Sequence, residues 1–162
     1  MSKTIKFIQG NEVCVEAALY AGLNFFAGYP ITPWSSIMES LRSELPRYGG
    51  IFVQTEDEIA AVSAAIGFSY SGHVAVTGSS GPGLSLKMEA LSYATMAEIP
   101  LIVINVQRGG PSTGQPTKVE QGDLLTTIYG SHGDAPKVVM AVSGIEDCFY
   151  SMITARKIAE TF

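Results

Sequence analysis

The residues with the clearest chemical potential are acids that stand directly before an uncharged helical segment. The run Thr55, Glu56, Asp57 and Glu58 precedes residues 59–68, which carry no charged side chain. In one interpretation Thr55 and Glu58 form a capping box, and the acids favour the first turn of a helix. In the other, the apolar helix buries one carboxylate, so that its pKa rises and it can share a proton with a ligand nitrogen. The residue pattern leaves both interpretations open.

A long polar loop carries the arginine of greatest interest. Residues 107–118 (QRGGPSTGQPTK) follow residues 101–106, an apolar and branched run that predicts a buried strand. Arg108 is therefore expected at the carboxyl end of a strand, in a chain with only 10 lysines and arginines. Its guanidinium fork suits a carboxylate substrate. A surface loop with a solvated arginine is the alternative.

Two prolines enclose a hydroxyl in the turn at residues 28–33 (GYPITP). Thr32 followed by Pro33 indicates a helix cap and a proline at the first helical position. The Thr32 hydroxyl and nearby amides could bind an anion at this helix N-terminus. The alternative is a capping threonine in a rigid turn.

A glycine-rich turn occupies residues 78–83 (GSSGPG). It lacks both the Walker lysine and the G-x-G-x-x-G order, so a phosphate loop is only weakly indicated. Its glycines instead favour a turn whose backbone passes close to a ligand or a partner. His73 and His132 are expected at a strand edge and in a turn. No pair of histidines or acids has metal-binding spacing, so we predict no metal site.

Composition excludes several classes of protein. The chain has 162 residues, enough for one domain, and a net charge of −5 without a basic block, so neither a nucleic-acid nor a membrane partner is expected. The uncharged stretch at residues 59–86 is broken by turns and cannot span a membrane. Only 15% of residues are charged and the mean hydropathy is +0.23, which suggests a surface buried against another chain, such as a homo-oligomer. Cys14 and Cys148 fit small buried residues in a reducing cytoplasm.

The pattern along the chain alternates strands and helices. Expected strands are 24–28, 51–54, 73–78, 101–106 and 137–141, and expected helices are 11–21, 33–45, 57–71, 84–95, 120–129 and 145–162. We expect Asn11 to cap the first helix, and Ser143 with Glu146 to form a capping box for the last. The last helix has no stop signal, which suggests that the chain is an N-terminal fragment of a longer protein.

Such alternation predicts an α/β fold with a mostly parallel sheet and helices on both faces. In these sheets ligands bind beyond the carboxyl ends of the strands. The turns at 29–36, 55–58, 78–83 and 108–118 are therefore expected to form the site.

Taken together, these segments closely resemble the α subunit of 2-oxoacid:ferredoxin oxidoreductases, particularly the 2-oxoglutarate type. The matching runs are 29–33 (YPITP), 54–61, 77–83, 107–123 and 130–134. The likeness extends from residue 10 to residue 149. Trp34 stands where members of the family carry a small residue.

The resemblance implies the thiamine diphosphate-binding fold, with residues 1–162 as its single pyrimidine-binding domain. It also implies a carboxylate beside N1′ of the aminopyrimidine. Glu58 lies nine positions before Gly67 and matches the family's E-x₈-G spacing, whereas Glu56 does not, so Glu58 is the expected catalytic residue. The resemblance places Thr32 and Arg108 at the substrate. The implied cofactor contacts are Tyr29, Pro30, Ile31, Thr32, Glu58, Ser80 and Gly81.

The implied activity is oxidative decarboxylation of a 2-oxo acid to an acyl-CoA, with electrons passing through an iron–sulfur cluster to ferredoxin. The sequence has no G-D-G run for a magnesium-bound diphosphate and no cysteine set for a cluster. A β subunit, or a segment of the protein outside this sequence, is therefore expected to supply the diphosphate site, Mg²⁺ and the cluster. This chain alone is expected to be inactive. Two alternatives remain: a non-catalytic assembly domain of the same fold, and a nucleotide-binding Rossmann-like protein, which would lack its glycine fingerprint.

Overall fold

A four-stranded parallel sheet forms the centre of the computed structural model, which describes residues 5–162. The strands are β1 (Phe25–Gly28), β2 (Ile51–Gln54), β3 (Ala75–Ser79) and β4 (Ile102–Asn105), in the order β2-β1-β3-β4. In the register, Gly28 lies opposite Gln54, and Ser79 lies opposite Asn105. The carboxyl ends of neighbouring strands therefore meet at one edge of the sheet.

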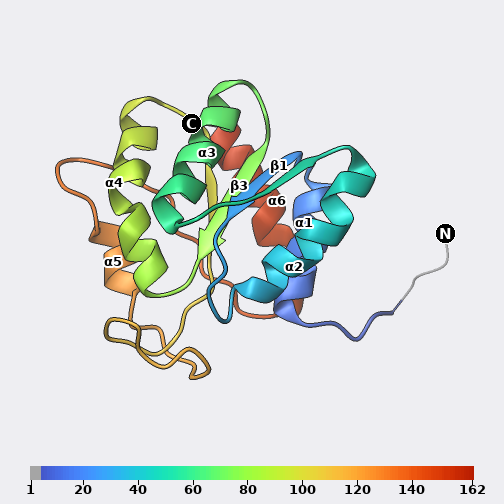
Figure 1. Ribbon diagram of the computed structural model, residues 1–162, viewed down its shortest axis with the longest axis horizontal. Helices are drawn as coiled ribbons and strands as arrows, with labels where there is room; N and C mark the ends of the chain where they lie inside the picture. Colours follow the sequence, from blue (N-terminus) through green and yellow to red (C-terminus); the bar gives the residue numbers. More distant parts are fainter. Residues whose placement is uncertain (1–4) are drawn as a thin grey trace.

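Helices cover both faces of this sheet, as predicted. They are α1 (Gly10–Tyr20), α2 (Ser35–Glu44), the short 3₁₀ helix η1 (Leu45–Tyr48), α3 (Glu58–Tyr70), α4 (Pro82–Met96), α5 (Leu124–Tyr129) and α6 (Ile145–Thr161). Helices α3 and α4 pack together on one face, here called the α3/α4 face. Helices α1, α2 and α6 pack on the other, the α1/α2/α6 face (Figure 1).

Alternation along the strands divides the core between the two faces. On the α1/α2/α6 face, Phe26 and Val76 join a cluster with Trp34, whose ring centroid lies 5.7 Å from that of Phe26. On the α3/α4 face, Phe25 packs with small alanines and stacks on Phe68 at a centroid distance of 3.6 Å. Both layers are thus held by apolar burial, the main stabilising term in folding.

The predicted strand at residues 137–141 is wrong: among the described residues this segment pairs with no other strand. Its apolar side chains are largely exposed, at 67% for Val138 and 38% for both Val139 and Met140. Strand β4 pairs with β3 on one side only. The apolar, β-branched pattern that favours a strand is not sufficient without a neighbouring strand to complete the hydrogen bonds.

Several helix starts also differ from prediction, because other side chains provide the hydrogen bonds. Helix α1 begins at Gly10, and the amide of Gln9 donates to the Glu12 carboxylate at 2.9 Å. Asn11 does not cap this helix; its side chain donates to the Pro33 carbonyl at 3.1 Å and so links α1 to the turn before α2. Helix α2 begins at Ser35, two residues later than expected.

At α6 the predicted start at Ile145 is confirmed, but the capping partner is not Glu146. The N-cap is Gly144, so the side chain able to reach back belongs to Asp147. The amide and hydroxyl of Ser143 donate to the Asp147 carboxylate at 2.9 and 3.2 Å. These hydrogen bonds, the backbone one first, hold the pKa of Asp147 below its usual value.

Candidate functional site

The turns that follow the strands gather at the carboxyl edge of the sheet, as the parallel order requires. They comprise residues 29–34 after β1, 55–57 after β2, 80–81 after β3 and 106–123 after β4. The last of these forms a long folded loop below the sheet, at the end towards which the β3 arrow points (Figure 1). The predicted helix over 120–129 is shorter and starts at Leu124, and Glu120 instead accepts a hydrogen bond from the Gly110 amide at 2.9 Å.

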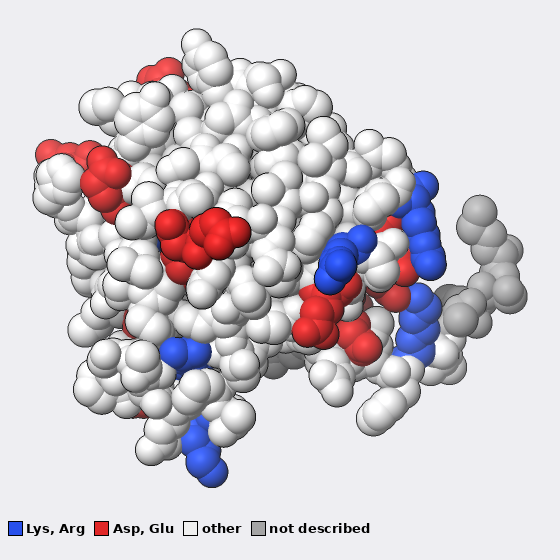
Figure 2. Space-filling model, viewed as in Figure 1, with Lys and Arg blue, Asp and Glu red and all other residues white. Residues whose placement is uncertain are grey.

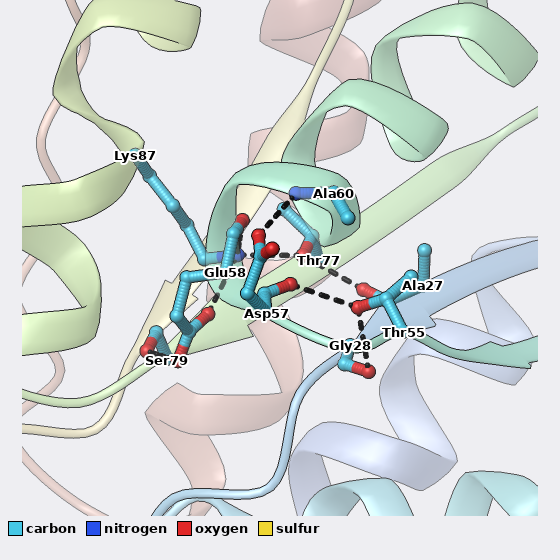
Figure 3. Close-up of polar contacts among 9 residues, drawn as sticks. All are labelled: Ala27, Gly28, Thr55, Asp57, Glu58, Ala60, Thr77, Ser79 and Lys87. Carbon is cyan, nitrogen blue, oxygen red and sulfur yellow. Dashed lines mark hydrogen bonds and ion pairs between the residues drawn. The ribbon is translucent and has the colours of Figure 1, made fainter.

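Asp57, not Glu58, caps helix α3. Its Oδ1 accepts from the amide of Ala60 at 2.8 Å, while the Thr55 hydroxyl donates to the Asp57 carbonyl at 2.9 Å. The capping-box interpretation of Thr55 and Glu58 is therefore wrong. Glu58 is the first residue of α3, and its side chain turns away from the helix start into the interior (Figure 3).

The Glu58 carboxylate is buried and held from two sides. The residue is 3% exposed. Its Oε1 accepts from the Ser79 hydroxyl at 2.5 Å, and its Oε2 lies 2.9 Å from Nζ of Lys87. Figure 3 shows the carboxylate between these two side chains, which come from β3 and α4. The interpretation that the apolar helix buries one carboxylate of the acidic run is confirmed, and that carboxylate is Glu58.

Lys87 is a buried residue that our sequence analysis did not identify. Its side chain is fully buried, and its Nζ also donates to the Glu58 carbonyl at 3.0 Å and lies 3.5 Å from the Thr77 hydroxyl. Burial lowers the pKa of Lys87, and the neighbouring Glu58 opposes that shift. The available signal was its place as the first charge after the uncharged stretch 59–86, inside a helix.

Two glycines of the 78–83 turn permit close packing. A Cβ on Gly83 would collide with Oγ of Ser79 and Oε1 of Glu58, and a Cβ on Gly78 would collide with the Trp34 ring. Between them, Gly81 adopts a φ of +47°, a region that L side chains rarely occupy. The turn thus approaches other side chains of this chain on both faces of the sheet: Trp34 at Gly78, and Ser79 with Glu58 at Gly83.

Arg108 connects three of the turns. It is 6% exposed, so the solvated-arginine alternative is wrong. Its Nη1 donates to the Thr32 carbonyl at 2.8 Å and its Nη2 to the Thr113 carbonyl at 2.7 Å. A Cβ on Gly81 would lie only 3.2 Å from its Nε. Arg108 and Thr32 are therefore brought together, although the two Nη donors of the fork are engaged by backbone carbonyls.

The other predicted site residues lie in the same turns with different exposure. Tyr29, Pro30 and Thr32 are exposed and Ile31 is half-buried. Ser80 is fully buried, and its hydroxyl has no hydrogen-bond partner. Trp34 is completely buried in the core beneath this turn, and its indole nitrogen is also unpartnered.

Unpartnered buried polar atoms concentrate at this edge. Buried polar side-chain atoms usually have a hydrogen-bond partner, so each exception points to strain or to function. Within the described residues all such atoms lie at or just beyond the carboxyl ends of the strands: Trp34 Nε1, Glu58 Oε2, Ser80 Oγ, Asn105 Oδ1, Gln107 Oε1, Arg108 Nε and Asp123 Oδ1. Oε2 of Glu58 forms a buried ion pair with the Lys87 ammonium at 2.9 Å. The edge therefore offers both donors and acceptors to a polar ligand.

Residues 5–162 carry neither a metal-binding cluster nor a membrane-spanning helix. No cluster of three or more histidine, cysteine, aspartate or glutamate residues could hold a metal ion there. In the same part of the chain, no helix is both long and apolar enough to cross a membrane.

Comparison with known protein families matches most of this chain. Residues 16–162 match the family described as pyruvate flavodoxin/ferredoxin oxidoreductase, thiamine diphosphate-binding. The matched segment includes every strand and every turn of the carboxyl edge.

Individual proteins with similar sequences carry consistent names. The chain is 52% identical to 2-oxoglutarate synthase subunit KorA of Archaeoglobus fulgidus over 158 residues, which are 98% of this chain and 46% of that protein. It is 48% identical to 2-oxoglutarate oxidoreductase subunit KorA of Mycobacterium tuberculosis over 149 residues, 91% of this chain and 23% of that protein. The chain thus spans less than half the length of these relatives.

A solved structure with the same fold is 2-oxoglutarate:ferredoxin oxidoreductase from Magnetococcus marinus, with 2-oxoglutarate, coenzyme A and succinyl-CoA bound. The match has a TM-score of 0.92 and 44% sequence identity, and it covers 94% of this chain and 27% of that one.

Proposed function

Because this chain belongs to the thiamine diphosphate-binding family of the pyruvate flavodoxin/ferredoxin oxidoreductases, we propose that it forms the pyrimidine-binding part of a 2-oxoacid:ferredoxin oxidoreductase α subunit. The proposed substrate is 2-oxoglutarate, and the proposed reaction is its oxidative decarboxylation to an acyl-CoA. The names of the similar proteins and the ligands of the similar structure support this choice. The matched relatives extend well beyond the region of similarity, which supports a longer α subunit of which this chain is one domain.

The observation that carries the proposal is the buried Glu58 carboxylate at the carboxyl edge of the sheet, which is held between the Ser79 hydroxyl and the Lys87 ammonium. A carboxylate is costly to bury, and a stable fold does not require one at this place. A carboxylate has about four acceptor sites, so it can accept a further hydrogen bond from a ring nitrogen. The residues present thus fit the pyrimidine end of thiamine diphosphate.

When bound, thiamine diphosphate supplies the carbanion chemistry that decarboxylation of a 2-oxo acid needs. Glu58 would hold the pyrimidine end of the cofactor by sharing a proton between its carboxylate and a ring nitrogen. Ser79 holds one oxygen of Glu58, so that the carboxylate cannot rotate freely. Burial under α3 and α4 excludes water and strengthens this interaction.

We assign the substrate end to the turn after β1 and to the loop after β4. Thr32 and Arg108 would hold the substrate carboxylate, and Tyr29, Pro30, Ile31, Ser80 and Gly81 would line the cofactor. The hydrogen bond from Arg108 to the Thr32 carbonyl supports a joint role for the two segments. The Nε of Arg108 has no partner within the described residues and is the donor left for a ligand.

We further propose that a β subunit supplies the diphosphate site, Mg²⁺ and the iron–sulfur cluster, with ferredoxin and coenzyme A as further partners, in a cytoplasmic enzyme. The exposed apolar surface supports partner chains, including a second copy of this one. Leu125 and Tyr129 of α5 are 69% and 75% exposed, and Val138 and Val142 nearby in sequence are 67% and 51% exposed. Figure 2 shows uncharged atoms over most of one side of the molecule, with acids and bases in a few separate groups.

Titration of thiamine diphosphate and Mg²⁺ into the complex of the full α subunit with its β subunit tests the proposal. We expect calorimetry to show weaker binding for Glu58→Ala than for the unaltered complex, with loss of 2-oxoglutarate oxidation. Glu56→Ala is the matched control, because Glu56 is exposed in the same acidic run. Equal affinity and activity for Glu58→Ala would contradict the proposal and favour the non-catalytic assembly domain.

A further inference from the structure

We propose that Lys87 is a positioning residue for Glu58: it fixes the carboxylate in its ionised form and in one orientation at the carboxyl edge of the sheet. This inference rests on the proposed function of Glu58 at the cofactor. It assigns a role to a residue outside the turns that carry the site.

The contacts of Lys87 hold Glu58 at two points. Its Nζ lies 2.9 Å from Oε2 of the carboxylate and donates to the backbone carbonyl of the same residue at 3.0 Å. The first contact holds the carboxylate group of Glu58, and the second holds its backbone. Rotation of the Glu58 side chain away from the sheet edge would break the first contact while the second remained (Figure 3).

Three separate elements determine this arrangement. Glu58 begins α3, Ser79 ends β3, and Lys87 lies in α4. Gly83 is four residues before Lys87 and therefore lies on the same face of α4. Its missing Cβ leaves the space that the carboxylate and the Ser79 hydroxyl occupy. In the first turn of α4, Gly83 thus leaves room for the Glu58 carboxylate, and one turn later Lys87 forms the ion pair with it.

Stability alone does not explain a buried ion pair. Replacing such a pair by apolar residues is often neutral or stabilising, whereas removing one partner leaves an uncompensated charge. A lone buried carboxylate takes up a proton, because burial disfavours the charged form. The Lys87 ammonium, 2.9 Å away, compensates the charge of the Glu58 carboxylate.

The surroundings of Lys87 contain few other charges. The charged groups that act on it are Glu58 and Asp57, both at the start of α3. From β3 it meets the Thr77 hydroxyl, which itself donates to the Ala27 carbonyl at 2.8 Å. Lys87 is therefore coupled electrostatically mainly to Glu58.

The test is Lys87→Met in the complex of the full α subunit with its β subunit, with Lys157→Met as control. Lys157 is exposed on α6, so the control makes the same chemical change away from the site. We expect kcat for 2-oxoglutarate to fall at least tenfold, about 1.4 kcal/mol of barrier, with little change in KM. We also expect the pH profile of kcat to change, because the positive charge beside Glu58 is lost. An unchanged kcat and pH profile would overturn the inference.

A cofactor-free readout tests the charge state directly. Infrared difference spectra against Glu58→Gln isolate the Glu58 carboxyl band. We expect an ionised carboxylate at neutral pH in the unaltered complex and a protonated carboxyl in Lys87→Met. An ionised band in both proteins would overturn the inference.

If Lys87→Met does not fold, the double variant Lys87→Met/Glu58→Gln decides. Recovery of the unfolding temperature in this double variant would support the proposal that the charge of Lys87 holds the Glu58 carboxylate. No recovery would show that Lys87 acts only by packing. Activity of Glu58→Gln separates the two proposals. If Glu58→Gln is active, the proposed function fails; if it is inactive while Lys87→Met behaves as the unaltered enzyme, only the present inference fails.

Discussion

Strand β3 presents opposite chemistry to the two layers of helices that cover the sheet. Towards α3 and α4 it places Thr77 and Ser79, whose hydroxyls lie beside Lys87 and Glu58. Towards α1, α2 and α6 it places Val76 and the bare backbone of Gly78. Trp34 fills the space over that glycine. One strand therefore supports a polar cluster on one side and an aromatic core on the other.

The contrast between the two faces distinguishes residues that stabilise the fold from residues that serve the candidate site. On the α1/α2/α6 face, close packing of large apolar groups stabilises the domain. On the α3/α4 face lies a buried ion pair, and replacing such a pair by apolar side chains is often neutral for stability. A substitution on the first face should change stability first, and a substitution in the polar cluster should change activity first.

The largest effect is expected for Glu58→Gln, which removes the charge and keeps the shape. In the assembled enzyme we expect 2-oxo acid oxidation to be abolished. The fold should persist because Asp57 caps α3, although the unfolding temperature should fall as Lys87 loses its partner. A retained rate within about tenfold of the unaltered enzyme, or about 1.4 kcal/mol of barrier, would contradict this assignment. Glu56→Gln should have much less effect.

Arg108→Lys, in the loop after β4, should have the next largest effect on activity. A lysine has the charge but cannot donate to the carbonyls of Thr32 and Thr113 with two parallel nitrogens. Because hydrogen bonds to charged groups contribute about 1.5–3 kcal/mol, we expect kcat/KM for the 2-oxo acid to fall about tenfold or more. Arg47→Lys is the control, since Arg47 forms only an exposed ion pair with Glu44. Normal kinetics for Arg108→Lys would show that the fork is not needed.

Gly78→Ala should disturb the aromatic face. The added Cβ would collide with the Trp34 ring and lie 2.6 Å from the Ile104 carbonyl, so we expect a loss of about 1–3 kcal/mol in the free energy of unfolding. Denaturant titration of the purified protein measures this change. In contrast, Gly67→Ala adds a methyl group to α3 with nothing within 4 Å, and it should stabilise the protein by about 0.4–1 kcal/mol. Equal stability of the two variants would remove the packing argument.

An effect that appears only at alkaline pH concerns Cys14, at the outer layer of the α1/α2/α6 face. Burial first, and then the neighbouring Cys148 thiol, raises the pKa of Cys14 to about 12. In the unfolded chain this thiol ionises near its ordinary value of about 8.5. Between these values the folded state binds more protons, so stability should fall as pH rises, by at most about 1.4 kcal/mol per pH unit. Cys14→Ala should reduce this slope in unfolding experiments at pH 8–10; an unchanged slope would contradict the raised pKa.

The parallel sheet was predictable because each strand is a short apolar run between turn signals. The segment at 137–141 has the same local signal, but a strand also needs a neighbour, which local sequence cannot specify. Helix starts were less predictable because adjacent residues compete for the same amides. At α3 the side chain of Asp57, not that of Glu58, accepts the hydrogen bond from a first-turn amide. At α6 the N-cap is Gly144, and Asp147 accepts the hydrogen bond from the Ser143 amide.

The candidate site divides in the same way. Glu58 could be singled out because the acidic run, its spacing to Gly67 and the family resemblance agree. Lys87 could not, because its partner lies 29 positions earlier and nothing local to α4 indicates an ion pair. The backbone targets of Arg108 were also beyond sequence, since they depend on how two turns 76 residues apart fold together.

The division of labour between Asp57 and Glu58 has a consequence for a cell that makes this protein. Because the cap and the buried carboxylate belong to different residues, a Glu58 variant can lose activity while keeping the start of α3 and the exposed apolar surface. If the proposed β subunit binds this surface, such a variant would still compete with the normal subunit for it. We therefore expect a Glu58 variant to have a dominant-negative effect when it is expressed together with the normal subunit. Activity should fall in proportion to the fraction of complexes that contain the variant.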